Sequence, residues 1–132
     1  MYVMKSKTIN KLSELTTYVV SVARFKDRHA HIKKQANEFG LDLEFIWNYD
    51  AETLSAEDLS RVDMDKLPLK SISTVLKHME AQRRLVESTN NFALVLEDDA
   101  ILFPEFSVTL NQILTSEHLP SEPFFIICWG CR

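Results

Sequence analysis

The sequence predicts an α/β fold with a largely parallel sheet, and two patterns support this class. Short apolar or β-branched segments, typical of strands, alternate with longer segments of helical periodicity. Residues 92–96 are apolar at every position, as expected of a strand buried on both faces of a parallel sheet. Right-handed crossovers between such strands place helices on the faces of the sheet. We therefore predict one α/β unit over residues 16–132, preceded by an N-terminal extension over residues 1–15.

The first half of the unit contains two predicted strands and a helix between them. Residues 16–22 are rich in β-branched and aromatic side chains, which favour a strand. Asp27 is placed to cap the next helix, and Gly40 is placed to close it. Residues 43–47 indicate a second strand, which ends near Asp50.

The second half contains three predicted helices and two strands. A capping box at residues 55–58 opens a short helix, and Pro68 precedes a long helix over residues 71–88. The apolar side chains predicted to be buried on this long helix are Ile72, Val75, Leu76, Met79 and Val86. Its charged side chains, predicted to form a solvated face, are Lys77, Glu80, Arg83, Arg84 and Glu87. After the apolar strand at residues 92–96, Pro104 is expected to be the first residue of the next helix. Residues 124–128 are predicted to form a fourth strand.

Composition excludes several classes of protein. The chain of 132 residues is 45% hydrophobic and 26% charged, as in globular domains. Its net charge of −4 argues against a nucleic-acid partner. We find no stretch long and apolar enough to span a bilayer, and no secretory signal in residues 1–15, so we expect a cytoplasmic protein. The two glycines, Gly40 and Gly130, cannot form a glycine-rich phosphate loop.

Three consecutive acids follow the apolar run and are the strongest indication of a site. Glu97, Asp98 and Asp99 should emerge at the carboxyl end of their strand, because a desolvated carboxylate needs partners. Open α/β sheets bind ligands at this end. Clustered carboxylates suit Mn²⁺ or Mg²⁺, which can hold a diphosphate. Because side chains alternate along an extended chain, Glu97 and Asp99 are the expected metal pair, and Asp98 is left for the ribose or a structural contact. A solvated acidic turn is the alternative interpretation.

Other charged residues are expected near the same edge. Arg24, Lys26 and Arg28 crowd the turn after the first strand, beside a helix N-terminus, which suits a phosphate; a solvated basic turn is the alternative. We expect Arg24 and Arg28 at the nucleotide end of the crevice, because neighbouring parallel strands end at one edge. Asp50, at the end of the second strand, is expected to face the crevice and bind substrate. His78 is predicted to be a helix-packing residue near the site rather than a general base.

The two cysteines form a C-x-x-C pattern, Cys128 to Cys131. A redox role requires a following helix to lower the thiol pKa, and the chain ends at Arg132. A zinc site requires further ligands, and the four histidines lack paired spacing. We therefore expect two reduced thiols.

Several segments, in order, resemble glycosyltransferase family 25, the lipopolysaccharide-biosynthesis glycosyltransferases that include the collagen galactosyltransferases. These segments are Tyr18–Val22 with Asp27 and Arg28, Phe45–Asp50, Ser73–His78, Leu94–Ala100 and Phe124–Cys131. The segment Leu94–Ala100 is similar to the most distinctive motif of the family. The chain departs from the family at Asn48 and Tyr49, where small residues are usual, and at Lys77, where serine is common.

The resemblance implies a GT-A fold, a Rossmann-like α/β/α sandwich that is incomplete at its C-terminus, since the likeness covers the first part of the family domain. It implies transfer of a hexose, commonly galactose from UDP-galactose, onto a glycan or lipooligosaccharide acceptor with the help of Mn²⁺. By this resemblance Glu97, Asp98 and Asp99 bind the metal and the nucleotide diphosphate. Such an acceptor also leads us to expect peripheral contact with the inner face of the membrane.

Two other classes of protein share some of these features. A phosphorelay receiver domain also has acids after an apolar strand, but it needs further βα units, and only 33 residues follow Asp99. A non-catalytic remnant that binds a nucleotide sugar stays open, because the later acids, Glu105, Glu117 and Glu122, include no obvious base. We expect the chain to bind a nucleotide sugar but to have weak or absent transfer activity. An apolar edge at residues 124–127 further predicts a homo-oligomer.

Overall fold

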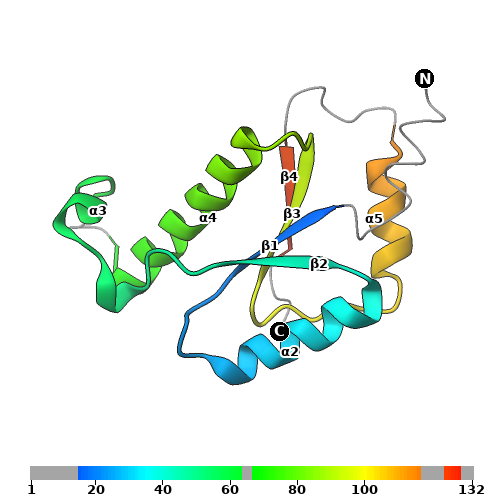
Figure 1. Cartoon of the computed structure of the whole chain (residues 1–132), viewed down its shortest axis with the longest axis horizontal. Helices are drawn as coiled ribbons and strands as arrows, with labels where there is room; N and C mark the ends of the chain where they lie inside the picture. The colour runs from blue at the N-terminus through cyan, green and yellow to red at the C-terminus, as the bar shows by residue number, and fades with distance from the viewer. Residues whose placement is uncertain (1–14, 64–66, 117–123, 129–132) are drawn as a thin grey trace.

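The computed structural model describes residues 15–63 and 67–116, and the backbone of residues 124–128. It confirms the α/β prediction: four parallel strands form an open sheet in the order β2-β1-β3-β4 (Figure 1). The strands are β1 (Thr16–Val20), β2 (Asp42–Ile46), β3 (Phe92–Glu97) and β4 (Phe124–Cys128). The helices are α2 (Lys26–Phe39), α3 (Ala56–Ser60), α4 (Leu69–Glu87) and α5 (Phe106–Leu114), with a short 3₁₀ helix η2 (Ala51–Thr53).

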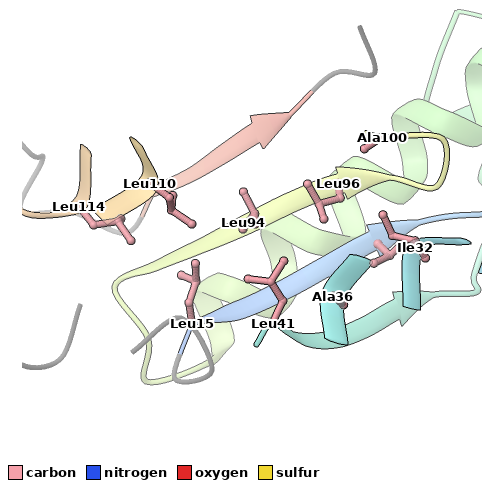
Figure 2. Close-up of a cluster of buried hydrophobic side chains, with 10 residues drawn as sticks. Leu15, Ile32, Ala36, Leu41, Leu94, Leu96, Ala100, Leu110 and Leu114 are labelled. Atoms are coloured by element: carbon pink, nitrogen blue, oxygen red, sulfur yellow. The ribbon is translucent and has the colours of Figure 1, made fainter. Parts of the chain in front are cut away.

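Helices cover both faces of the sheet, as in a Rossmann-like sandwich (Figure 1). On one face, α2 and α5 pack on β1 and β3 through a buried apolar cluster that includes Val19, Ile32, Leu94 and Leu110 (Figure 2). On the other face, α4 packs on the sheet through a second cluster: Tyr18, Val20, Ile46, Ala81, Leu85, Ala93 and Val95. Successive residues of β3 alternate between the two clusters, which explains why the strand is apolar at every position.

The strand register brings the carboxyl ends of β1, β2 and β3 to one level. Val20 lies beside Ile46 of β2 and beside Glu97 of β3. The loops that leave these three strand ends must therefore start close together at one edge of the sheet. This edge is where the acidic residues and the basic turn meet.

Several helix ends follow the sequence signals. Gly40 closes α2 in the left-handed conformation, with φ of 67°, and its amide donates to the carbonyl of Ala36. The predicted capping box is present: Ser55 accepts from the amide of Asp58, and the Asp58 side chain accepts from the amide of Ser55, both at 3.0 Å. Asp27 does not cap α2. It lies inside the first turn, where its charge complements the helix dipole.

The boundaries of several elements differ slightly from the predictions. β1 ends at Val20 and β2 ends at Ile46. Helix α4 begins at Leu69, directly after Pro68, which occupies the N-cap. Helix α5 begins at Phe106, with Glu105 at the N-cap, so Pro104 precedes the helix rather than opening it.

The predicted buried stripe of α4 is wrong in part. Ile72 and Leu76 are buried, but Val75, Met79 and Val86 are 39%, 38% and 71% exposed. The buried positions of α4 are instead Ile72, Ser73, Leu76, Lys77, Glu80, Ala81 and Leu85. Lys77 and Glu80, predicted on a solvated face, are thus buried, because Lys77 finds acceptors in the segment after β2 and Glu80 is paired with arginines of α4 itself.

Some predictions concern residues outside the described part of the chain. These are the extension before Leu15, the acids Glu117 and Glu122, and the thiol of Cys131; for β4 only the backbone is described, so its apolar edge and the side chain of Cys128 stay predictions. Among the described residues, no helix has the length and apolar character needed to cross a membrane.

Glu80 connects α4 to the edge strand through two arginines. Its carboxylate accepts hydrogen bonds from Arg83 at 2.7 and 2.8 Å and from Arg84 at 2.9 Å. The hydrogen bond from Arg83 contributes most to lowering the pKa of Glu80, which falls to about 2. Arg84 also donates to Glu44 at 2.7 Å and to the side chain of Asn48 at 3.0 Å, so the same carboxylate holds the guanidinium that joins α4 to β2.

We expect Glu80→Gln to lower the free energy of unfolding by about 1–3 kcal/mol at neutral pH. Because the pKa of Glu80 is lowered in the folded state, its contribution exists above the ordinary value of 4.5 and is lost as pH falls to about 2. Urea denaturation across this pH range measures the difference. Glu87→Gln is the control, since that side chain also pairs with Arg83 but is 64% exposed. A difference that did not change with pH would contradict the assignment.

Candidate functional site

A cavity of about 350 Å³ opens at the carboxyl edge of the sheet. Its walls are the ends of β1 and β3, the loop after β1, the first turn of α2, the start of η2 and the first half of α4. Its size and position are typical of small-molecule sites in open α/β sheets. The charged residues that line it are Arg24, Arg28, Glu52, Lys70, Lys77, Glu97, Asp98 and Asp99.

The three consecutive acids form the end of β3 and the turn that follows. Glu97 is the last residue of the strand, and the amide of Ala100 donates to the Glu97 carbonyl at 3.1 Å, which closes the turn. All three carboxylates line the cavity, so the prediction that they emerge at the strand end is confirmed. Their surroundings nevertheless differ.

Asp98 connects three elements of the fold through hydrogen bonds. Its residue is 6% exposed, its Oδ2 accepts from the hydroxyl of Ser21 at 2.6 Å, and its Oδ1 accepts from Arg28 at 3.2 Å. Ser21 follows β1, and Arg28 lies in the first turns of α2. Of the two roles left open for Asp98, the structure therefore shows the structural contact.

Glu97 and Asp99 are half-buried. The Nε2 of His78 on α4 lies 3.7 Å from Oε1 of Glu97, so this histidine packs beside the site, as expected. Within the described part of the chain, no three His, Cys, Asp or Glu side chains are grouped to hold a metal ion. The two carboxylates could therefore hold a cation only together with oxygens of a ligand.

The loop after β1 supplies the basic side of the cavity. Arg24 and Arg28 flank the ring of Phe25, with guanidinium carbons 5.1 and 4.6 Å from the ring centroid. Arg24 also pairs with Glu52 of η2. Both arginines line the cavity that the acids line, on the edge where we expected them. Guanidinium groups placed in this way suit an anionic ligand.

Asp50 is not among the residues that line the cavity, although its neighbour Ala51 and its partner Lys77 are. Its carboxylate accepts from the amide of Ala23 at 3.1 Å and from the ammonium of Lys77 at 2.8 Å. These partners occupy both carboxylate oxygens. That Asp50 faces the crevice and binds substrate stays a prediction.

Gln35 fixes the loop that follows the acidic turn. From α2, its side-chain nitrogen donates to the carbonyl of Ala100 at 2.7 Å, and its oxygen accepts from the amide of Leu102 at 2.7 Å. His31 also contacts the Ala100 carbonyl through Nε2 at 3.1 Å. An amide side chain that satisfies both backbone groups of a loop restrains it strongly.

The model of glycosyltransferase family 25 (LPS biosynthesis protein) matches residues 14–129 of the chain. The chain belongs to glycosyltransferase family 25. No curated protein matches it. The resemblance noted from the sequence is thereby confirmed, and the chain is a glycosyltransferase of a family that acts in lipopolysaccharide biosynthesis.

The family 25 match spans the whole cavity, and it includes residues that the sequence analysis did not single out for the site. These are Ser21, Glu52, Lys70, Ser73 and Lys77. The position of Ser21 directly after the first strand could have indicated a place in the site, because the loops that follow parallel strands meet at one edge of the sheet. Lys77 was marked in the sequence only as a departure from the family within Ser73–His78 and was expected on a solvated face, because periodicity alone does not show which polar side chains of α4 are buried.

We expect Ser21→Ala to destabilise this family 25 chain by about 1.5–3 kcal/mol, because it leaves one buried oxygen of the Asp98 carboxylate without its donor. Chemical denaturation at neutral pH measures the loss. In the matched control, Ser60→Ala, the lost hydroxyl donates to the Glu57 carbonyl on an exposed helix, so a smaller effect is expected. Equal effects would show that Ser21 does not support the acidic turn.

Proposed function

We propose that the cavity binds a UDP-sugar together with a divalent cation, and that the chain transfers a hexose such as galactose to a glycan acceptor of the lipopolysaccharide type. One observation supports this proposal most directly. In a member of glycosyltransferase family 25, carboxylates and guanidinium groups line a single cavity at the carboxyl edge of a parallel sheet. A nucleoside diphosphate with a cation has the complementary charges.

Glu97 and Asp99 are the residues proposed to hold the cation. Carboxylate oxygens are the ligands that Mn²⁺ and Mg²⁺ prefer, and a site with one or two carboxylates commonly takes its remaining ligands from substrate phosphates and water. The donor set fits this description, since two half-buried carboxylates line the cavity beside arginines. A bound cation would stabilise the negative charge that develops on the departing UDP.

Arg24, Arg28 and Lys70 are proposed to face the diphosphate. Arg24 comes from the loop after β1, Arg28 from the first turn of α2 and Lys70 from the first turn of α4, so cations approach the cavity from two sides. The positive end of the α4 dipole adds to this field. Phosphate groups favour such guanidinium contacts because they accept bidentate hydrogen bonds.

We assign no catalytic base. Among the acids of the cavity, Asp98 is occupied by Ser21 and Arg28, and Glu52 is paired with Arg24. Glu105 occupies the N-cap of α5 and does not line the cavity. The alternative of a module that binds a nucleotide sugar without transferring it is decided by an assay for UDP release from UDP-hexoses.

The proposal predicts that UDP binding depends on Mn²⁺ and on the two carboxylates. Calorimetric titration of UDP and of UDP-galactose, with and without Mn²⁺, is expected to show binding in the presence of the metal and its loss in Asp99→Asn. Glu97→Gln is expected to have the same effect, because each variant removes a charged ligand. Glu105→Gln, an acid outside the cavity, is the control and should bind as wild type. Unchanged UDP binding in both Asp99→Asn and Glu97→Gln would contradict the assignment of these carboxylates to the metal.

His78 is predicted to orient Glu97 and not to act as the base. His78→Gln keeps a polar side chain next to Glu97, so we expect transfer activity to fall by less than about tenfold. Steady-state kinetics with a lipooligosaccharide acceptor test this. Complete loss of transfer in a variant that still folds and binds UDP would refute the prediction.

A further inference from the structure

Lys77 has the most unusual environment of any charged residue that the structure describes. It lies in the middle of α4, and the whole residue is 1% exposed. Its ammonium donates to the carbonyl of Asn48 at 2.6 Å, to Asp50 Oδ1 at 2.8 Å and to the carbonyl of Ile46 at 3.3 Å. An ammonium has three donors, and three acceptors surround it, so the cost of its burial is offset by full hydrogen bonding.

All three acceptors belong to one segment, which runs from the end of β2 to the start of η2. Tyr49, in the middle of this segment, has φ of 70°, a conformation that residues other than glycine seldom adopt. The hydroxyl of Ser73, one turn before Lys77 on α4, donates to the Tyr49 carbonyl at 2.5 Å. Two side chains of α4 therefore hold the segment in a conformation that it would not favour alone.

Asp50 connects this segment to the loop after β1, residues 21–25, which we call the arginine loop because it contains Arg24. While Oδ1 accepts from Lys77, Oδ2 accepts from the amide of Ala23 at 3.1 Å. Ala23 directly precedes Arg24, and the same loop leads to Arg28. The residue after Asp50 lines the cavity, as does Glu52, the partner of Arg24.

We propose that Lys77 is a positioning residue for the cavity: its ammonium orients Asp50, and Asp50 holds the loop that carries Arg24 and leads into the first turn of α2, where Arg28 lies. This inference rests on the proposed function only for its consequence, namely that the arginine loop is set in place for the donor diphosphate. The positioning itself is a property of the ligand-free chain. Preorganised cations of this kind raise affinity because less order has to be gained on binding.

The chemistry of an asparagine at position 50 gives a direct test. An ammonium is only a donor, so in Asp50→Asn the amide oxygen must face Lys77. The amide nitrogen then faces the backbone N–H of Ala23, and two donors meet. When Lys77 is also replaced by methionine, the asparagine can turn its oxygen to Ala23. The second substitution should therefore repair the first.

Hydrogen exchange of the Ala23 amide, followed by NMR in the ligand-free chain, measures the effect. We expect its protection to fall about tenfold in Asp50→Asn and to return toward wild type in the Asp50→Asn, Lys77→Met double variant. The matched control combines Asp50→Asn with Arg84→Met, which removes a different α4 cation that bonds Glu44 and Asn48, and should not restore protection. The Asp50→Asn, Lys77→Met double variant removes both buried charges together and leaves no unpaired carboxylate, so we expect it to fold. Equal protection in Asp50→Asn and in the Lys77 double variant would overturn the proposal.

UDP affinity in the presence of Mn²⁺, measured on the same variants, tests the consequence. We expect it to fall about tenfold in Asp50→Asn and to recover in the Lys77 double variant but not in the Arg84 double variant. Affinity that stayed low while the Ala23 amide recovered would show that loop position does not set donor binding. If the wild-type chain bound no UDP, the proposed function would fail, and the Ala23 amide would still decide the role of Lys77.

Discussion

The carboxylate of Asp98, buried at the end of a parallel strand, is the constraint on which the site depends. A buried carboxylate needs donors, and Asp98 takes them from Ser21 after β1 and from Arg28 on α2. These bonds draw together the ends of two neighbouring strands and the start of a helix. The flanking acids, Glu97 and Asp99, are thereby placed along the cavity wall, and Arg28 is held at the same wall.

A second buried charge, Lys77, acts from the opposite side of the sheet. Helix α4 covers the face opposite to α2 and α5, and its polar side chains reach under the cavity. Ser73 and Lys77 fix the segment after β2, and Glu80 holds Arg84 against the same strand. The cavity is thus supported by charges on both faces of the sheet, while the two apolar clusters supply the bulk of the packing.

The predictions from sequence succeeded where one local signal agreed with the packing. The uniform apolarity of residues 92–96 identified a strand covered on both faces, and Gly40 and the Ser55 capping box marked helix ends correctly. They failed where polar side chains are buried. On α4, hydrophobicity favoured Val86, which is 71% exposed, over Lys77, which is 1% exposed. Periodicity cannot show which polar side chains will find partners beneath a helix.

The sequence by itself determined the α/β class, the parallel sheet and the location of the acids at a strand end, because these follow from apolar periodicity and from the cost of burying charge. It also carried the family 25 resemblance. Only the tertiary structure decided how the charges divide their roles: Asp98 binds Ser21 and Arg28, and Asp50 pairs with the buried Lys77, whereas Glu97 and Asp99 line the cavity half-buried. The reason is physical. Each role depends on which donors lie within about 3 Å of a carboxylate, and these donors come from residues far apart in the chain, brought together only by strand register and helix packing.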